Sequence, residues 1–472
     1  MRRMALGILL VGMFLPAAGA DGPETRGGGP CAADLNSDGL TNIVDLASLL
    51  STYGLNSGEP GYLEAADYDG NGAITIADLA FLLAEYGCSS SVMVTRLQFS
   101  GAGFYNVAHD CASGNCTNYS TPHYLDNNAD GDADDPGDRM YPVAYTRNSY
   151  VTVSNLRFAV VPADLTMADV PVIGFGPDGL QFEGAGSLNA GVLSVGTVRS
   201  DIHLPNVTAA YDPFEIEWHV SLTPDRFQFA GISRNRMYVT LGNPSGRRLE
   251  SFFDISTRAA AGTDKSADAI DRIWAEFADL HVEDVDGNVL GYYRDVLCAS
   301  QCTVYDAQGL VIHHNGQCGS WADLMMKCLD TQGITGSTFV TIEPINTSWL
   351  GILVNNYLFA GSGTSGCSSF PYKLNSPCDG PYWPGGAECT DADGVPGQDN
   401  PNPASYFGRH FIVLINGKFY DPSYGAGPFT GTSSQANLAW EQASMAGYIG
   451  ICGSYYAARK DVYGTRETGF EY

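Results

Sequence analysis

The 472-residue sequence is poor in charge and poorest in positive charge. Lysine and arginine number 24 against 52 aspartate and glutamate residues, which gives a formal net charge of −28 at pH 7. Such a chain is a poor partner for nucleic acid or for an acidic polysaccharide, because like charges repel. Charged residues make up only 16% and glycines number 56, which favours loop-rich β structure over helical bundles.

Long apolar runs are missing after residue 20. Residues 1–20 combine a basic start, an apolar middle and the small residues Ala18-Gly19-Ala20, a pattern typical of a secretory signal peptide cleaved after Ala20. No later segment approaches the run of ~20 apolar residues that spans a bilayer. We therefore expect a protein that is secreted or attached to the cell surface, without a membrane span.

Cysteine is plentiful, and 12 cysteines fit an oxidising compartment. If Cys318 and Cys328 are set aside, the other ten can form five bridges, although a bridge between these two would also use all twelve. Geometry argues against that bridge. On one helix, ten residues at a rise of 1.5 Å hold the two cysteines about 15 Å apart, beyond the reach of a disulfide.

Residues 31–88 contain an internal repeat. "DLNSDGLTNIVDLASLLSTYG" from Asp34 aligns with "DYDGNGAITIADLAFLLAEYG" from Asp67, at an offset of 33 residues. In each copy the apolar residues that follow the acidic half recur at i, i+3, i+4 and i+7. This period predicts one amphipathic helix per copy, ended by Gly54 or Gly87.

The acidic half of each copy has the spacing of an EF-hand-like calcium loop, with oxygen ligands at positions 1, 3, 5, 7, 9 and 12. The predicted ligands are Asp34, Asn36, Asp38, Leu40, Asn42 and Asp45 in the first loop, and Asp67, Asp69, Asn71, Ala73, Thr75 and Asp78 in the second. Position 7, Leu40 or Ala73, contributes its backbone carbonyl. The spacing predicts calcium as the cofactor. The alternative is a pair of acidic turns that bind nothing, and it would have to explain why the same spacing occurs in both copies.

The doubled loop, the single helix after each loop and the aspartate at position 12 resemble a dockerin module, over residues 31–88. Dockerins bind cohesin modules and so attach enzymes to extracellular assemblies. The resemblance implies a cohesin-like or another extracellular docking partner.

The sequence pattern changes in residues 93–255. Short runs rich in valine, tyrosine, phenylalanine and threonine, such as "SYVTVSNLRFAVV" and "FEIEWHVSL", are separated by glycine, proline and asparagine, which predicts an antiparallel β-sandwich. Within it, "DNNADGDADDPGD" from Asp126 to Asp138 begins like a third calcium loop but has Gly137 at position 12. This run is either an irregular calcium site or a solvated acidic loop.

"NGQCGSWADLMMKC" places Cys318 at the predicted start of a helix, where the positive end of the helix dipole favours a thiolate. The buried face of this helix is predicted to comprise Trp321, Leu324, Met325 and Cys328.

A cysteine nucleophile also needs a base and a group that orients the base. "HFIVLINGKFYD" predicts a hairpin around Asn416-Gly417 that pairs Ile412 with Asp421. His410 is then the diagonal neighbour of Asp421 on the same face, within reach of a hydrogen bond.

A cysteine at a helix start, a histidine on a strand and an aspartate at the end of the next strand resemble the transglutaminase-like superfamily, over roughly residues 264–472. The resemblance implies an α+β, papain-like fold. It implies Cys318 as nucleophile, His410 as general base and then acid, and Asp421 as orienter, with backbone N–H groups near Cys318, and Gln317 as a candidate helper, stabilising the oxyanion.

Two further interpretations concern the same region. "GQCGSWA" also resembles the papain-like cysteine proteases, but the second cysteine of their signature is missing and the third member here is aspartate rather than asparagine. His313 and His314 are either surface or loop residues or metal ligands.

Together these patterns predict a multidomain protein: a signal peptide (1–20), a small α calcium-loop module (31–88), a β-sandwich (93–255) and a transglutaminase-like domain (264–472). The predicted function is acyl transfer or hydrolysis at peptide or carboxamide bonds of protein or peptide substrates. The alternative is a non-catalytic surface or assembly protein of a dockerin-organised complex, such as one that degrades polysaccharide. No paired carboxylates in a sugar-cleft context support glycosidase chemistry.

Overall fold

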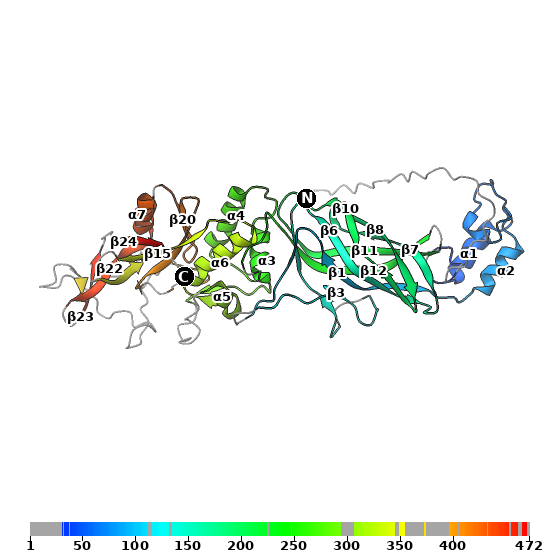
Figure 1. Cartoon of the computed structure of the whole chain (residues 1–472), viewed down its shortest axis with the longest axis horizontal. Helices are drawn as coiled ribbons and strands as arrows, with labels where there is room; N and C mark the ends of the chain where they lie inside the picture. Colours follow the sequence, from blue (N-terminus) through cyan, green and yellow to red (C-terminus); the bar gives the residue numbers. More distant parts are fainter. Residues whose placement is uncertain are drawn as a thin grey trace, which may run out of the picture.

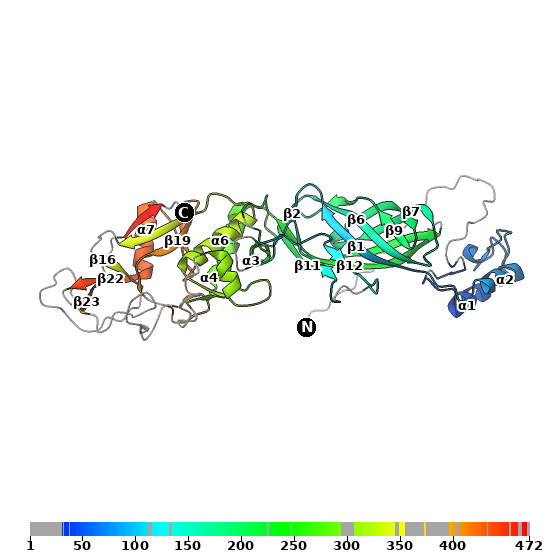
Figure 2. The same cartoon turned by 60° about the horizontal axis from the view of Figure 1, so that its bottom comes forward.

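The computed structural model describes residues 31, 33–36, 38–111, 116–131, 135–223, 226–246, 248–293, 306–344, 349–354, 372–373, 396–401, 403, 406–431, 433–452, 455–460 and 465–469. The predicted signal peptide lies outside these residues, as do Cys298, Cys302, Cys367, Cys378 and Cys389. Within them the protein is of mixed α/β class, with seven α-helices and one large β-sheet. Figure 1 shows three groups of elements following one another along the long axis, and the turned view keeps the same order (Figure 2).

The first group comprises α1 (Ile43–Thr52), the 3-10 turn η1 (Glu64–Ala66) and α2 (Ile76–Ala84). Both helices start with a capping box, in which the side chain before the helix and the aspartate three residues on satisfy each other's backbone N–H groups. The core is small, namely Ala33, Leu49, Ala66, Ile74 and Leu82. A disulfide between Cys31 and Cys88 joins the two ends of this group.

Only part of the predicted apolar face of each helix is buried. Leu49 and Leu82 are fully enclosed, whereas Leu50 and Leu83, one residue further on, are 51% and 53% exposed. Two short helices cannot enclose every apolar side chain of a repeat, because so small a unit keeps a high ratio of surface to volume.

The second group is a 12-stranded sheet. Its strands are β1 (Ser91–Ser100), β2 (Phe104–Asn106), β3 (Tyr124–Leu125), β4 (Arg139–Met140), β5 (Val143–Thr146), β6 (Tyr150–Val161), β7 (Met167–Phe175), β8 (Gln181–Asn189), β9 (Val192–Val195), β10 (Val198–His203), β11 (Ala209–Thr223) and β12 (Arg226–Thr240), with the turn η2 (Pro177–Gly179) before β8. The order is β2-β5-β12-β11-β7-β8-β10-β6-β1-β3-β4, and β9 pairs with β6 and β8. Among the described strands of this sheet every pair is antiparallel except β5 with β12, which is parallel and departs from the predicted antiparallel pattern.

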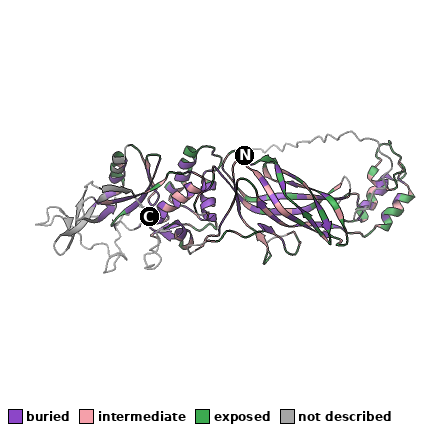
Figure 3. Ribbon diagram, viewed as in Figure 1, coloured by how far each residue is buried: buried purple, intermediate pink, exposed green. Residues whose placement is uncertain are grey.

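Buried and more exposed residues alternate along much of the longer strands of this sheet (Figure 3). In β11, Phe214, Ile216, Trp218 and Val220 are fully buried, as a strand with one apolar face requires. The sheet folds over on itself, so that β1 also contacts β12. Gly231 permits the close approach: its backbone has φ +91°, and a Cβ there would lie 2.6 Å from the sulfur of Met93.

The third group contains five helices and the remaining strands. The helices are α3 (Glu250–Ala259), α4 (Ser266–Ala278), α5 (Ala307–His313), α6 (Cys318–Thr331) and α7 (Ser433–Ser444). One sheet has the order β21 (Ala426–Phe429), β20 (Lys418–Asp421), β19 (His410–Ile415), β15 (Thr338–Pro344), β24 (Thr465–Gly469). Another has the order β17 (Tyr372–Lys373), β23 (Tyr455–Lys460), β22 (Met445–Cys452), β16 (Trp349–Val354), β18 (Tyr406–Phe407), and β13 (Gly291–Tyr292) pairs with β14 (Asn315–Gly316).

The core of the third group begins before residue 264. Leu249, Phe252 and Ile255 of the α3 region lie in the same apolar cluster as α4, α6 and β19. On the other side of α3, Phe253 stacks on Tyr238 of β12. Helix α3 therefore packs between the large sheet and the α6 core.

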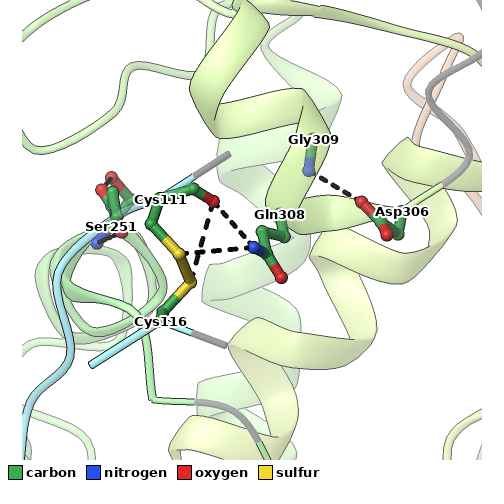
Figure 4. The surroundings of a disulfide bond; sticks show 7 residues. Cys111, Cys116, Ser251, Asp306, Gln308 and Gly309 are labelled. Carbon is green, nitrogen blue, oxygen red and sulfur yellow. Dashed lines mark hydrogen bonds between the residues drawn. A yellow bond between two sulfur atoms is a disulfide. The ribbon is translucent and has the colours of Figure 1, made fainter. Parts of the chain in front are cut away.

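A second disulfide, Cys111–Cys116, lies beside α5 (Figure 4). The side-chain amide of Gln308 in α5 donates to the carbonyl oxygen of Cys111 at 2.7 Å. Helix α5 begins after Asp306, whose carboxylate accepts the N–H of Gly309 at 2.7 Å and caps the helix. The loop that follows β2 is thus tied to the helix that precedes Cys318.

Across the residues that the structure describes, none of the helices has both the length and the apolar character needed to cross a bilayer.

Candidate functional site

The β19–β20 hairpin brings His410 and Asp421 together. Asn416 and Gly417 both have positive φ, 50° and 74°, as the tight hairpin turn predicted from Asn-Gly requires. The paired residues are Val413 with Tyr420, Leu414 with Phe419, and Ile415 with Lys418, which confirms the predicted register. Nε2 of His410 lies 2.8 Å from Oδ2 of Asp421, and both side chains are buried.

Cys318 is the first residue of α6, as predicted, and Gln317 precedes it in extended conformation. The backbone carbonyl of Gln317 accepts the hydroxyl of Ser320 at 2.8 Å, which closes the first turn. Gly316 makes room for this turn, because a Cβ there would lie 2.3 Å from the Ser320 oxygen. Helix α6 packs against β19, so the strand that carries His410 lies next to the helix that carries Cys318.

Cys318 and Cys328 are both free thiols and both buried. Trp321, Leu324, Met325 and Cys328 are fully enclosed, which confirms the predicted buried face of α6. Burial raises the pKa of the Cys328 thiol far above its ordinary value, so this cysteine stays protonated and inert in the core. Cys318 is 4% exposed, so only small reagents suit it as probes.

The electrostatics of His410 link it to both partners. Burial by itself would lower the pKa of His410, but the Asp421 carboxylate and the Cys318 thiol outweigh burial and raise this pKa to about 10. Because Nε2 bonds Asp421, Nδ1 is the nitrogen left for Cys318, and Nδ1 is buried without another partner among the described residues. The imidazolium form is thus favoured at neutral pH, and it is the form that pairs with a thiolate.

Trp440 of α7 completes the enclosure of the His–Asp pair, and no local sequence pattern marks it for this role. Its indole N–H donates to Oδ2 of Asp421 at 3.1 Å, the same oxygen that faces His410. Its ring stacks on the imidazole with centroids 5.7 Å apart and 17° between the planes. Phe407 and Tyr424 also lie within 5.7 Å of the imidazole. The imidazole is therefore fixed by aromatic rings and by one shared carboxylate.

The other oxygen of Asp421 accepts the backbone N–H of Ser423 at 3.2 Å. A carboxylate bonded on both oxygens has a fixed orientation. That orientation in turn fixes which nitrogen of His410 faces Cys318.

The remaining residues singled out near the thiol directly precede Cys318 in the chain. Gln317 is buried at the start of α6, His313 ends α5, and His314 follows it with left-handed φ 53°. His314 lies 3.0 Å from the carboxylate of Asp284. Groups of three or more potential metal-ligating His, Cys, Asp or Glu side chains, searched for over the described residues, do not include either histidine.

In the first acidic loop, carboxylate oxygens of Asp34, Asp38 and Asp45 all lie within 4.8 Å of one another. Asp45 is fully buried and accepts the backbone N–H groups of Leu35, Asn36 and Asn42. The amide of Asn36 donates to Asp38 at 2.8 Å. Asn42 caps α1 through the N–H of Val44, so its side-chain oxygen already has a donor, and Leu40 follows the glycine turn.

The second loop repeats this arrangement. Carboxylate oxygens of Asp67, Asp69 and Asp78 lie within 4.8 Å of one another, and Asn71 donates to Asp69 at 2.8 Å. Asp78 holds the backbone N–H groups of Tyr68, Asp69 and Thr75. Thr75 caps α2 through the N–H of Ala77, and Ala73 occupies position 7. Three mutually repelling carboxylates in a partly buried loop suit a hard cation with oxygen ligands.

The third acidic run has a different form. Asp126 is 1% exposed, and its two oxygens accept the N–H groups of Ala129 and Gly131. The amide of Asn128 donates to Asp130 and Asp135. Among the described residues this run does not form a converging group of three carboxylates.

No protein-family model matches the chain, and no curated protein matches it either.

Proposed function

We propose that the protein is a secreted, transglutaminase-like cysteine enzyme that carries out acyl transfer or hydrolysis at peptide or carboxamide bonds of protein or peptide substrates. One observation carries the proposal: a buried His410–Asp421 pair, fixed by Trp440, lies on the hairpin that packs against the helix started by a free Cys318. A thiol, a base and an orienter in this order are the parts of a nucleophilic cysteine site.

In the first step, the Cys318 thiolate attacks the substrate carbonyl carbon and a sulfur–carbon bond forms. The carbonyl π electrons move onto oxygen, and the N–H groups at the start of α6, which lack intrahelical acceptors, are placed to receive that charge. The His410 imidazolium then gives its Nδ1 proton to the leaving amine as the carbon–nitrogen bond breaks, which leaves a thioester on Cys318.

In the second step, neutral His410 takes a proton from water or from an amine at Nδ1. The resulting nucleophile attacks the thioester, and the sulfur leaves as thiolate beside the re-formed imidazolium. Throughout, Asp421 keeps the other proton of the ring on Nε2. Water gives hydrolysis and an amine gives transfer; we favour hydrolysis, because no acceptor site for an amine stands out in the sequence.

We also propose that the large sheet is a β-sandwich between this enzyme domain and a calcium-binding, dockerin-like module over residues 31–88. The doubled spacing of oxygen-bearing residues in the sequence supports calcium as the ion. When bound, calcium would neutralise the carboxylate charges and fix the loops that begin α1 and α2. Export of the chain is supported by the signal pattern of residues 1–20 and by the disulfides Cys31–Cys88 and Cys111–Cys116.

An activated ester tests the chemistry without knowledge of the natural substrate. Incubation with p-nitrophenyl acetate should release p-nitrophenolate and leave an acetyl group on Cys318, identified by peptide mass mapping. Cys318→Ala should abolish both signals, and the matched variant Cys328→Ala should keep them. Transfer of the acetyl group to an added primary amine distinguishes a transferase from a hydrolase. If wild-type protein never acetylates Cys318, the proposal is wrong and the non-catalytic assembly role takes its place.

A further inference from the structure

Tyr292 of β13 lies next to the start of α6. Strand β13 pairs in parallel with β14, and Tyr292 is the register partner of Gly316, two residues before Cys318. The Tyr292 backbone N–H donates to the carbonyl of Gln398 at 2.8 Å, and its own carbonyl accepts the side-chain amide of Asn400 at 2.8 Å. The backbone that carries this tyrosine is therefore held on both sides.

The Tyr292 ring also belongs to the aromatic enclosure of the base. It packs edge-on against Tyr424 with centroids 5.2 Å apart, and it stacks on Phe407 at 6.4 Å. These same two rings lie within 5.7 Å of the His410 imidazole. Tyr292 thus contacts the same two rings that contact His410, and it pairs across β13 and β14 with a residue two positions before Cys318.

The hydroxyl of Tyr292 is buried and has no hydrogen-bond partner among the described residues. Leaving a buried hydroxyl unpaired costs stability, and such groups are uncommon in folded proteins. Burial, and after it the neighbouring Tyr424 and Cys318, raise the pKa of Tyr292 well above its ordinary value. The group therefore stays an O–H donor over the whole working range of pH.

We propose that the Tyr292 hydroxyl donates a hydrogen bond to the oxyanion that forms when Cys318 attacks a carbonyl. The inference rests on the proposed cysteine chemistry and adds a catalytic residue to it. A donor that is already desolvated and fixed stabilises developing negative charge without reorganisation. The backbone N–H at the start of α6 supplies a second donor from the other element of the site.

Two reagents separate this role from others. With p-nitrophenyl acetate, the sulfur–carbon bond forms, an oxyanion appears on the carbonyl oxygen, and p-nitrophenolate then leaves. With iodoacetamide, the same thiolate displaces iodide in one step and no oxyanion forms. Tyr292→Phe should therefore slow acetylation of Cys318 by roughly 10²–10³-fold, while the rate of alkylation stays close to that of wild type.

The matched control is Tyr238→Phe, which also removes a hydroxyl from a buried tyrosine. Tyr238 lies in β12 of the large sheet, stacks on Phe253 of α3 and is outside the α6 core. This substitution should leave both rates unchanged. Because the Tyr292 hydroxyl has no partner to lose among the described residues, Tyr292→Phe should unfold at a temperature equal to or above that of wild type.

The outcomes are distinct. If wild type and Tyr292→Phe acetylate Cys318 at the same rate, the inference is wrong and the proposed function stands. If Tyr292→Phe slows acetylation and alkylation equally, Tyr292 acts on the thiolate or on folding, and the oxyanion role is overturned. If wild type alkylates but never acetylates, the proposed function and the inference fail together.

Discussion

Asp421→Asn isolates the contribution of the buried carboxylate to the reactivity of Cys318. The asparagine side chain would keep the shape of the aspartate but remove its charge. An amide oxygen in the place of Oδ2 would still accept from Trp440 and His410, and the NH₂ group would then meet the N–H of Ser423. The His410 imidazolium would lose the carboxylate charge that most strongly raises its pKa, so the neutral ring would be favoured.

The expected magnitude follows from the thiolate population. An ordinary thiol with a pKa near ~8.5 is thiolate in roughly one molecule in 300 at pH 6. The His410 imidazolium, whose pKa is raised to about 10, stays charged at this pH and can pair with a thiolate. A stabilised thiolate is intrinsically less nucleophilic, so the difference in alkylation rate is smaller than the difference in thiolate population. We therefore expect Asp421→Asn to lower the alkylation rate at pH 6 on the order of tenfold or more.

The assay is iodoacetamide labelling from pH 6 to 9, with the rate followed on the Cys318 peptide by mass spectrometry. At pH 6 wild type should be labelled faster than Asp421→Asn, and the difference between the two rates should shrink towards pH 9. The control is Asp271→Asn, which should behave as wild type. Asp271 is an exposed residue of α4 whose carboxylate lies 3.8 Å from Nζ of Lys418 in the β19–β20 hairpin. Identical rate profiles for wild type and Asp421→Asn would refute the reasoning.

Three further predictions concern calcium, the core and pH. Calcium should raise the melting temperature followed by circular dichroism, and Asp78→Asn, which removes one of three converging carboxylates, should reduce that gain; no change on chelation would contradict calcium binding. Cys328→Ser buries a hydroxyl in the α6 core and should lower the free energy of unfolding by about 1–3 kcal/mol in denaturant titrations, with labelling of Cys318 unchanged; an unchanged midpoint contradicts the burial. The raised pKa of His410 means that its charge stabilises the fold fully below its ordinary pKa of 6.5 and that this contribution is lost as pH rises through about 10. The difference in unfolding free energy between wild type and His410→Gln should accordingly shrink from pH 7 to pH 10, and a constant difference would contradict the assignment.

The parts of the site that depend on local chemistry were predictable from the sequence. The Asn416-Gly417 turn sets the register of its own hairpin, and that register places His410 beside Asp421 whatever the rest of the chain does. The start of α6 at Cys318 likewise follows from its apolar period and the glycines around it.

Tertiary placement was not predictable in the same way. Trp440 reaches Asp421 from a separate helix and Tyr292 approaches Cys318 through a two-residue strand; neither has a local pattern that marks it. The parallel pairing of β5 with β12 is also set by how the large sheet closes. A single sequence encodes such contacts only through the whole fold.

The reactivity of Cys318 in unreduced wild-type protein tests the central claim most directly. Brief treatment with iodoacetamide at pH 6, followed by peptide mapping, should label Cys318 and leave Cys328 unmodified, and His410→Ala should abolish the early labelling. A Cys318 that stays unlabelled until a reductant is added, or that reacts equally fast in His410→Ala, would contradict the account.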